Sequence, residues 1–145
     1  MYVLEKKKLS LLKILSMDYK FYVLKSFEKE AKALLKKYKS LSKDLVKLQT
    51  EIETNPLLGV NLGGGYKKLR LNISSKNKGK SGGARVITHE IIISIKEEND
   101  TKSVLFVSIY DKSDFESIDI TLLENYVNEF RENEVNKSKE KKWTN

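Results

Sequence analysis

The stretch YKKLRLNISSKNKGKSGGARVITHEIIISI, residues 66–95, contains two strand-like runs separated by a loop of glycines and lysines. In the first run, residues 66–73, apolar and polar side chains alternate, so Lys68 and Arg70 share one face of the predicted strand. The other face carries leucine and isoleucine and must pack on the core. The second run, residues 84–95, is rich in β-branched residues and predicts a long central strand.

Upstream of this stretch the sequence predicts one strand and two helices. YKFYVLKSF, residues 19–27, is aromatic and β-branched and indicates a first strand. Apolar residues then recur at helical spacing over 27–38 and again over 41–52, and serine caps lie between the two sets. Pro56 follows the second helix, and NLGGG, residues 61–65, is interpreted as a flexible entry to the next strand.

Downstream, residues 103–110 (SVLFVSIY) predict the last strand, and residues 120–130 predict a closing helix with Asp119 as its cap. The expected order is β-α-α-β-β-β-α. It defines an α+β fold in which a helical hairpin covers one face of a small, mostly antiparallel sheet. The opposite face is expected to be partly open and charged.

The ends of the chain are predicted to lie outside this domain. Residues 1–16 form a lysine-rich apolar leader, which has two interpretations. It is either a basic amphipathic segment or an over-extended start of the reading frame, in which case translation begins at Met17. The second interpretation is preferred. The domain is predicted to span residues 17–132. Residues 133–145 are expected to form a charged, flexible tail.

The charge distribution favours a polyanionic partner. The chain has 28 Lys and Arg against 20 Asp and Glu, a formal net charge of +8, and residues 54–89 contain no acidic side chain. A lysine-rich surface arising by chance is the alternative. With no cysteine and a single histidine, His89, within a predicted strand, the sequence predicts neither a metal site nor a cofactor.

The loop itself is not a nucleotide-binding loop of the Walker type. Gly79-Lys80-Ser81 lacks the required glycine five residues earlier, where Ser74 stands, and a strand is expected where a helix should begin. We interpret the loop as a holder of a polynucleotide backbone. The lysines predicted to bind RNA phosphates are Lys67, Lys76, Lys78 and Lys80.

Three motifs, YKKLRL, NKGKSGGARVI and VSIYDKSDFESI, together resemble the RelE/ParE superfamily of bacterial toxins, most closely its HigB-like and RelE-like branch. The resemblance implies a toxin of a type II toxin–antitoxin system with that family's fold. Many such toxins cleave mRNA on the ribosome through attack of a ribose 2′-hydroxyl on the adjacent phosphodiester. The ParE members instead poison DNA gyrase.

Carried over motif by motif, the resemblance implies four catalytic residues: Lys68, Arg70, Arg85 and Lys112. Such cations stabilise the negative charge that develops in phosphoryl transfer. Some RelE enzymes have a tyrosine base where this chain has Ile118, which leaves Tyr110 or Lys112 as substitutes. The implied partners are a cognate antitoxin, the ribosome and mRNA, in the cytoplasm and without a membrane. A gyrase inhibitor and a basic RNA-binding module without catalysis remain the alternatives.

Overall fold

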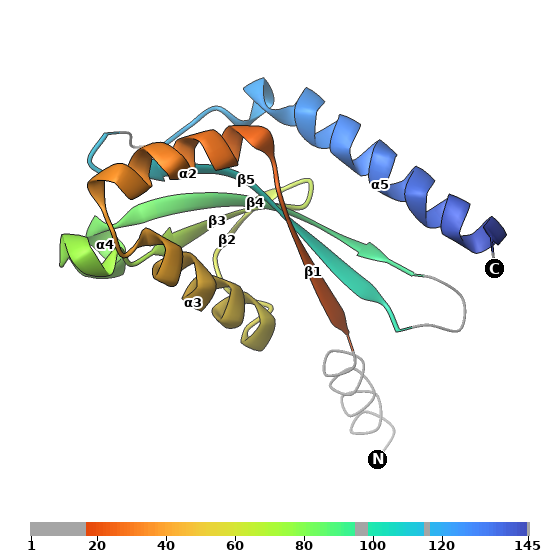
Figure 1. Cartoon of the computed structure of the whole chain (residues 1–145), viewed down its shortest axis with the longest axis horizontal. Helices are drawn as coiled ribbons and strands as arrows, with labels where there is room; N and C mark the ends of the chain where they lie inside the picture. The colour runs from red at the N-terminus through yellow and green to blue at the C-terminus, as the bar shows by residue number, and fades with distance from the viewer. Residues whose placement is uncertain (1–16, 95–98, 115–116, 145) are drawn as a thin grey trace, which may run out of the picture.

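The computed structural model describes residues 17–94, 99–114 and 117–144, with side chains to Lys137. The predicted leader, residues 1–16, lies outside the described residues. The fold is α+β, built on a mixed sheet with the order β1-β5-β4-β3-β2 (Figure 1). The strands are β1 (Asp18–Val23), β2 (Val60–Gly63), β3 (Tyr66–Leu71), β4 (Ala84–Ile93) and β5 (Thr101–Asp111).

Most of the sheet is antiparallel, as expected. The neighbours β2–β3, β3–β4 and β4–β5 pair antiparallel, whereas β1 pairs with β5 in parallel. The register of β4 and β5 shifts between Ile87 and Thr88, a β-bulge that increases the local twist.

One face of the sheet is covered by a helical hairpin, α2 (Lys25–Lys37) and α3 (Leu41–Thr54). Helical spacing places their apolar side chains on one stripe, and these pack on the inward-facing residues of β3, β4 and β5. Leu69 and Leu71 lie in this core and are almost completely buried. The ring of Phe27 lies 5.3 Å from that of Phe106, centroid to centroid. The predicted hairpin is confirmed.

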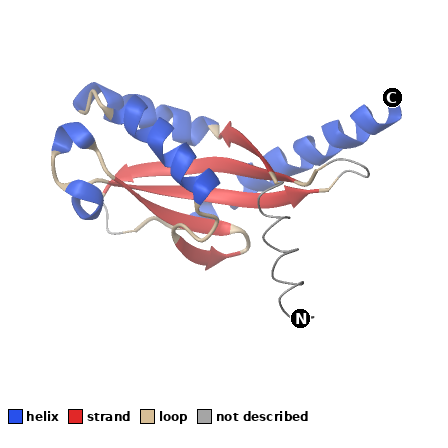
Figure 2. Cartoon of the chain, turned by 90° about the horizontal axis from the view of Figure 1, so that it is seen from below, coloured by secondary structure: helices blue, strands red, loops and turns tan. Residues whose placement is uncertain are grey.

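The opposite face holds a second, smaller core. A 3₁₀ turn, η2 (Ile120–Leu122), and helix α5 (Glu124–Thr144) lie over it, and Val127 packs among Ile87, Leu105 and Val107. Asp119 caps the turn by accepting a hydrogen bond from the Thr121 amide at 3.0 Å. The C-terminal part of α5 projects past the sheet in both views (Figure 1 and Figure 2).

Several element boundaries differ from the predicted ones by two to four residues, and three differences change the arrangement of the elements. The first strand ends at Val23, because the chain turns into α2 at Lys25 and Phe27 becomes a helical core residue. The glycine-rich entry contains a short edge strand, β2. Helix α5 continues through the predicted tail to Thr144, and Glu134, within this part, is buried and accepts a hydrogen bond from Ser103 on β5.

Candidate nucleic-acid interface

A row of three side chains crosses the sheet at the end nearest the lysine loop. In the register of the strands, Arg70 on β3 lies opposite Arg85 on β4, and Arg85 lies opposite Tyr110 on β5. Arg70 is exposed, and Lys68, two residues earlier on the same face, is half-buried. The prediction that alternation turns Lys68 and Arg70 away from the α2–α3 core is confirmed.

Arg85 is buried under the loop and holds it in place. Its Nη1 donates hydrogen bonds to the carbonyl oxygens of Lys80 (3.0 Å) and Ala84 (3.1 Å), and its Nη2 donates to that of Ser81 (3.2 Å). Burial lowers the pKa of Arg85, and the neighbouring charge of Arg70 lowers it further. Arg85, to which the resemblance assigns a catalytic role, therefore donates two hydrogen bonds to the loop backbone and one to the first residue of β4.

The start of the loop is fixed to the α2–α3 turn. η1 (Ser74–Lys76) begins where Ser74 donates to both carboxylate oxygens of Asp44, from its Oγ at 2.6 Å and from its amide at 3.0 Å. Ser40 Oγ also donates to Asp44. Burial alone would raise the pKa of Asp44, but these hydrogen bonds lower it below its ordinary value.

Lys76 is a structural residue of the loop. Its Nζ lies 2.6 Å from Asp111 Oδ1 and donates to Ser113 Oγ at 2.8 Å, and its side chain is 9% exposed. Tyr38 donates to the other oxygen of Asp111 at 2.7 Å. Burial raises the pKa of Asp111, but the hydrogen bonds, led by that from Lys76, outweigh burial and hold it well below its usual range. A lysine paired in this way is poorly placed to bind RNA phosphates.

The remaining loop cations point to solvent. The loop contains a single helical turn, α4 (Gly79–Gly82), and both Lys78 and Lys80 are exposed. Lys80 forms an exposed ion pair with Glu51 at 2.8 Å, which costs little to exchange for a phosphate. Lys112 is also exposed, and its amide donates to the Gly83 carbonyl at 3.1 Å, which places it beside the loop.

Gly83 allows the loop to lie directly against β3. A Cβ at this position would come within 2.0 Å of the Leu71 carbonyl oxygen, so any side chain would displace the backbone. This close approach brings the loop next to Arg70 and Arg85. The structure thus brings the loop with Lys78 and Lys80 to the end of the sheet where Arg70, Arg85 and Lys112 lie, with Lys68 two residues before Arg70 on the same face. The ammonium group of Lys80 turns toward Glu51 on α3, which covers the opposite face.

Lys67 does not join this group. It alternates with Lys68 and therefore lies on the opposite face, where its Nζ donates to the Pro56 carbonyl at 2.9 Å and pairs with Glu90 at 3.4 Å. This placement separates Lys67 from Lys68 and Arg70, and its ammonium group is held by the Pro56 carbonyl and Glu90.

Of the two side chains considered for a general base, Tyr110 is enclosed. Tyr110 is 3% exposed, and burial raises its pKa, which favours the protonated phenol. Ile118 packs against the second core, which includes Tyr110. Of the two substitutes named above, Lys112 is the exposed one.

His89 takes part in a buried network that holds α5 to the sheet. Arg131 donates from Nε to His89 Nδ1 at 3.0 Å, and from Nη1 to Ser103 Oγ and Glu134 Oε1, both at 2.7 Å. His89 Nε2 lies 3.0 Å from the Gly64 carbonyl, so the ring is neutral with its proton on Nε2. Burial lowers the pKa of His89, and the Arg131 charge lowers it further. His89 lies within β4, inside the strand predicted for it, and is packed as a structural residue.

Three residues with structural roles at these sites were not singled out from the sequence: Asp44, Asp111 and Arg131. Each has a partner in another element, Ser74 for Asp44, Lys76 for Asp111 and His89 for Arg131, which the neighbouring sequence does not indicate. Among residues 17–94, 99–114 and 117–144, no cluster of three or more His, Cys, Asp or Glu side chains could hold a metal ion. Within the same residues, no helix combines the length and apolarity needed to cross a membrane.

Comparison with protein-family models, with curated proteins and with solved structures found no match.

Proposed function

We propose that this protein is the toxin of a type II toxin–antitoxin system and cleaves mRNA on the ribosome. The observation that carries the proposal is the cross-strand pair of Arg70 and Arg85 beside an acid-free basic loop. This pair lies within the three motifs that resemble RelE/ParE toxins. The exposed guanidinium group of Arg70 suits a phosphodiester, whose non-bridging oxygens accept paired hydrogen bonds, while the buried Arg85 beside it holds the loop.

In the proposed reaction the ribose 2′-hydroxyl attacks the adjacent phosphorus, and the 5′-oxygen of the next nucleotide leaves. A 2′,3′-cyclic phosphate remains. Arg70, which is exposed, and Lys68 contact the non-bridging oxygens and stabilise their growing charge. Lys112, exposed beside Gly83, is the candidate for proton transfer at the attacking or leaving oxygen.

Arg85 has a different role in this proposal. Because it donates to the carbonyls of Lys80 and Ser81, it acts as a positioning residue that sets the shape of the loop. Lys78 and Lys80 then contact phosphates of the bound RNA or of ribosomal RNA. Their flexible, exposed ammonium groups supply affinity without sequence readout.

A second candidate function is a basic RNA-binding module without catalysis. The enclosure of Tyr110 favours it, because a general base must reach its substrate, and Ile118, at the position of the family's tyrosine, has no group that accepts a proton. Under this alternative the basic loop binds RNA and no bond is broken.

The test is brief induction of the protein in a bacterial host, followed by mapping of RNA 5′ ends. Ribosome-dependent cleavage predicts growth arrest and new ends within codons, which disappear from a reporter whose start codon is destroyed. Co-expression of a cognate antitoxin should relieve the arrest. Double-strand DNA breaks with intact mRNA would favour gyrase poisoning. RNA binding without arrest or new ends would favour the non-catalytic module.

A further inference from the structure

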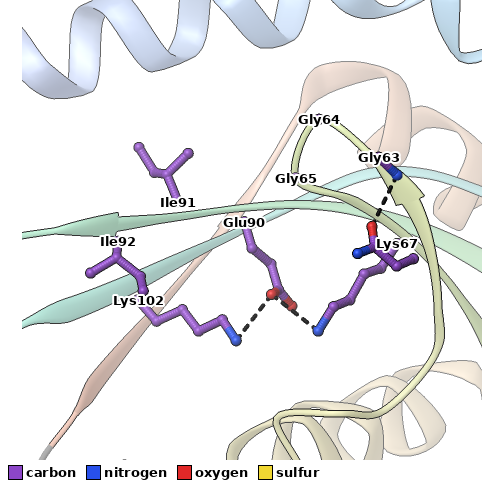
Figure 3. A pocket seen from close by; sticks show the side chains of 9 residues that line it. Gly63, Gly64, Gly65, Lys67, Glu90, Ile91, Ile92 and Lys102 are labelled. Carbon is purple, nitrogen blue, oxygen red and sulfur yellow. Dashed lines mark hydrogen bonds and ion pairs between the residues drawn. The ribbon is translucent and has the colours of Figure 1, made fainter. Parts of the chain in front are cut away.

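A second cationic site lies on the opposite face of the sheet, away from Arg70. It is a pocket of about 450 Å³ formed by the β2–β3 turn, β4 and β5. Figure 3 shows Lys67 and Lys102 reaching toward Glu90 from two sides, with the turn Gly63–Gly64–Gly65 nearby. The proposed nuclease does not use this pocket.

The charges in the pocket do not balance. Lys67 Nζ lies 3.4 Å and Lys102 Nζ lies 3.1 Å from the same atom, Glu90 Oε2. The three side chains are 18%, 13% and 10% exposed, respectively, so water screens them poorly. Two ammonium groups around one carboxylate leave a net charge of +1, which is the charge that a singly charged anion would neutralise.

The ammonium group of Lys102 has N–H donors that are available to a ligand. Lys67 Nζ also donates to the Pro56 carbonyl, whereas the polar partner of Lys102 Nζ among the residues that the structure describes is Glu90 Oε2, at 3.1 Å. Its other contact is with the ring of Tyr19, whose centroid is 5.9 Å away. An ammonium group carries three donors, and its ion pair with Glu90 occupies one, so two remain for a ligand in the pocket. An oxyanion in the pocket would accept from them.

The walls of the pocket define what kind of anion fits. Ile92, directly opposite Lys102 in the β4–β5 register, is 57% exposed and offers an apolar surface beside the ammonium group. Gly65 has φ +86°, and a Cβ there would come within 2.8 Å of the Glu90 carbonyl oxygen, so glycine keeps the turn close to β4. Recessed lysines beside an apolar wall suit a small ligand better than an extended phosphate backbone.

We propose that the Lys67–Glu90–Lys102 pocket binds a small monocarboxylic acid, with its carboxylate at Lys102 and its apolar part on Ile92. The net charge of +1 on the two lysines and Glu90 makes the pocket specific for a ligand with a single negative charge. Glu90 limits the affinity, because its carboxylate competes with the ligand for both lysines.

The experiment is an NMR titration of the ¹⁵N-labelled full chain with hexanoate, with hexanol as the uncharged probe of matched length. Hexanoate should produce saturable shifts at the amides of Gly64, Gly65, Glu90 and Ile92, and hexanol should not. Lys102→Met should weaken binding about tenfold or more. Glu90→Gln should strengthen it, since the pocket then carries +2. Lys32→Met serves as the control, because Lys32 pairs with Glu28 in an exposed ion pair on α2.

Three results would overturn the assignment: equal shifts with hexanol, unchanged affinity in Lys102→Met, or weaker binding in Glu90→Gln with the fold intact. If a short oligoribonucleotide saturates the same amides and hexanoate does not, the pocket is part of a nucleic-acid surface and the carboxylate assignment is wrong. None of these results depends on whether the protein cleaves mRNA.

Discussion

Arg70 on β3 and Arg85 on β4 lie directly opposite each other in an antiparallel pair. Like charges in this position normally destabilise a sheet. The two guanidinium groups have different surroundings, since Arg85 is buried against loop carbonyls and Arg70 is exposed to solvent. This difference predicts that replacing Arg85 lowers the stability of the fold, whereas replacing Arg70 does not.

Replacement of Arg70 should spare the fold, whereas replacement of Arg85 should not. Arg70→Ala removes a like-charge contact, so the free energy of unfolding should stay within about 0.5 kcal/mol of the wild-type value or rise slightly. Arg85→Ala leaves the carbonyls of Lys80 and Ser81 without their donor and should cost about 1–3 kcal/mol. Urea denaturation of both variants measures the difference. Equal effects would contradict the division of roles.

Lys76 should behave unlike its neighbours in the loop. Lys76→Met leaves Asp111 buried without its cation and should lower the free energy of unfolding by about 3–5 kcal/mol. Lys78→Met, at an exposed position in the same loop, is the matched control and should change it by less than about 0.5 kcal/mol. Thermal and urea unfolding provide the measurement. Similar stability of the two variants would show that the Lys76–Asp111 pair does not hold the loop.

His89 should make stability depend on pH in the mildly acidic range. The folded state lowers the pKa of His89 and keeps the ring neutral, so below an ordinary pKa of about 6.5 the unfolded chain binds a proton that the folded chain does not. Stability should therefore fall as pH falls, by up to about 1.4 kcal/mol per pH unit until the folded pKa is reached. In His89→Gln this component disappears. Urea midpoints at pH 7.5 and 5.5 for both proteins test it, and an equal pH dependence would refute it.

The exposed loop lysines should determine the salt dependence of RNA binding. Replacing Lys78 and Lys80 with glutamine should weaken binding and reduce the slope of log K against log salt by about one for each lost phosphate contact. Lys32→Gln, remote on α2, should leave the slope unchanged. Filter binding over a range of salt concentrations gives the slopes. A slope that is unaffected by the loop substitutions would place the RNA elsewhere.

Local patterns in the sequence predicted the parts of the fold that depend on local periodicity. The alternation around Lys68 and Arg70 was sufficient because neighbouring side chains in a strand must point to opposite faces. The pairing of elements that are distant along the chain leaves no comparable pattern in the local sequence. The parallel pairing of β1 with β5, and the buried ion pair of Lys76 with Asp111 35 residues away, depend on contacts that the neighbouring sequence does not encode.

The same limit applies to the candidate site. The charge pattern identified the basic segment but could not separate cations that face solvent from cations that support the loop. Lys76 and Lys78 are both loop lysines in the sequence, yet one is buried against Asp111 and the other is exposed. The extension of α5 was missed for a related reason, since its charged sequence reads as a tail while Arg131 and Glu134 pack against Ser103.

The most direct test of the central claim is single-turnover cleavage of an mRNA on programmed ribosomes by the wild type and by Arg70→Ala. The account predicts that the wild type cuts within the codon in the ribosomal A site. Arg70→Ala should bind the ribosome with similar affinity but cleave more slowly by on the order of 10²–10³-fold, as when another charge-stabilising donor is removed. Lys32→Ala should cleave at the wild-type rate. Cleavage by Arg70→Ala at the wild-type rate once bound, or ribosome binding by the wild type without cleavage, would contradict the account.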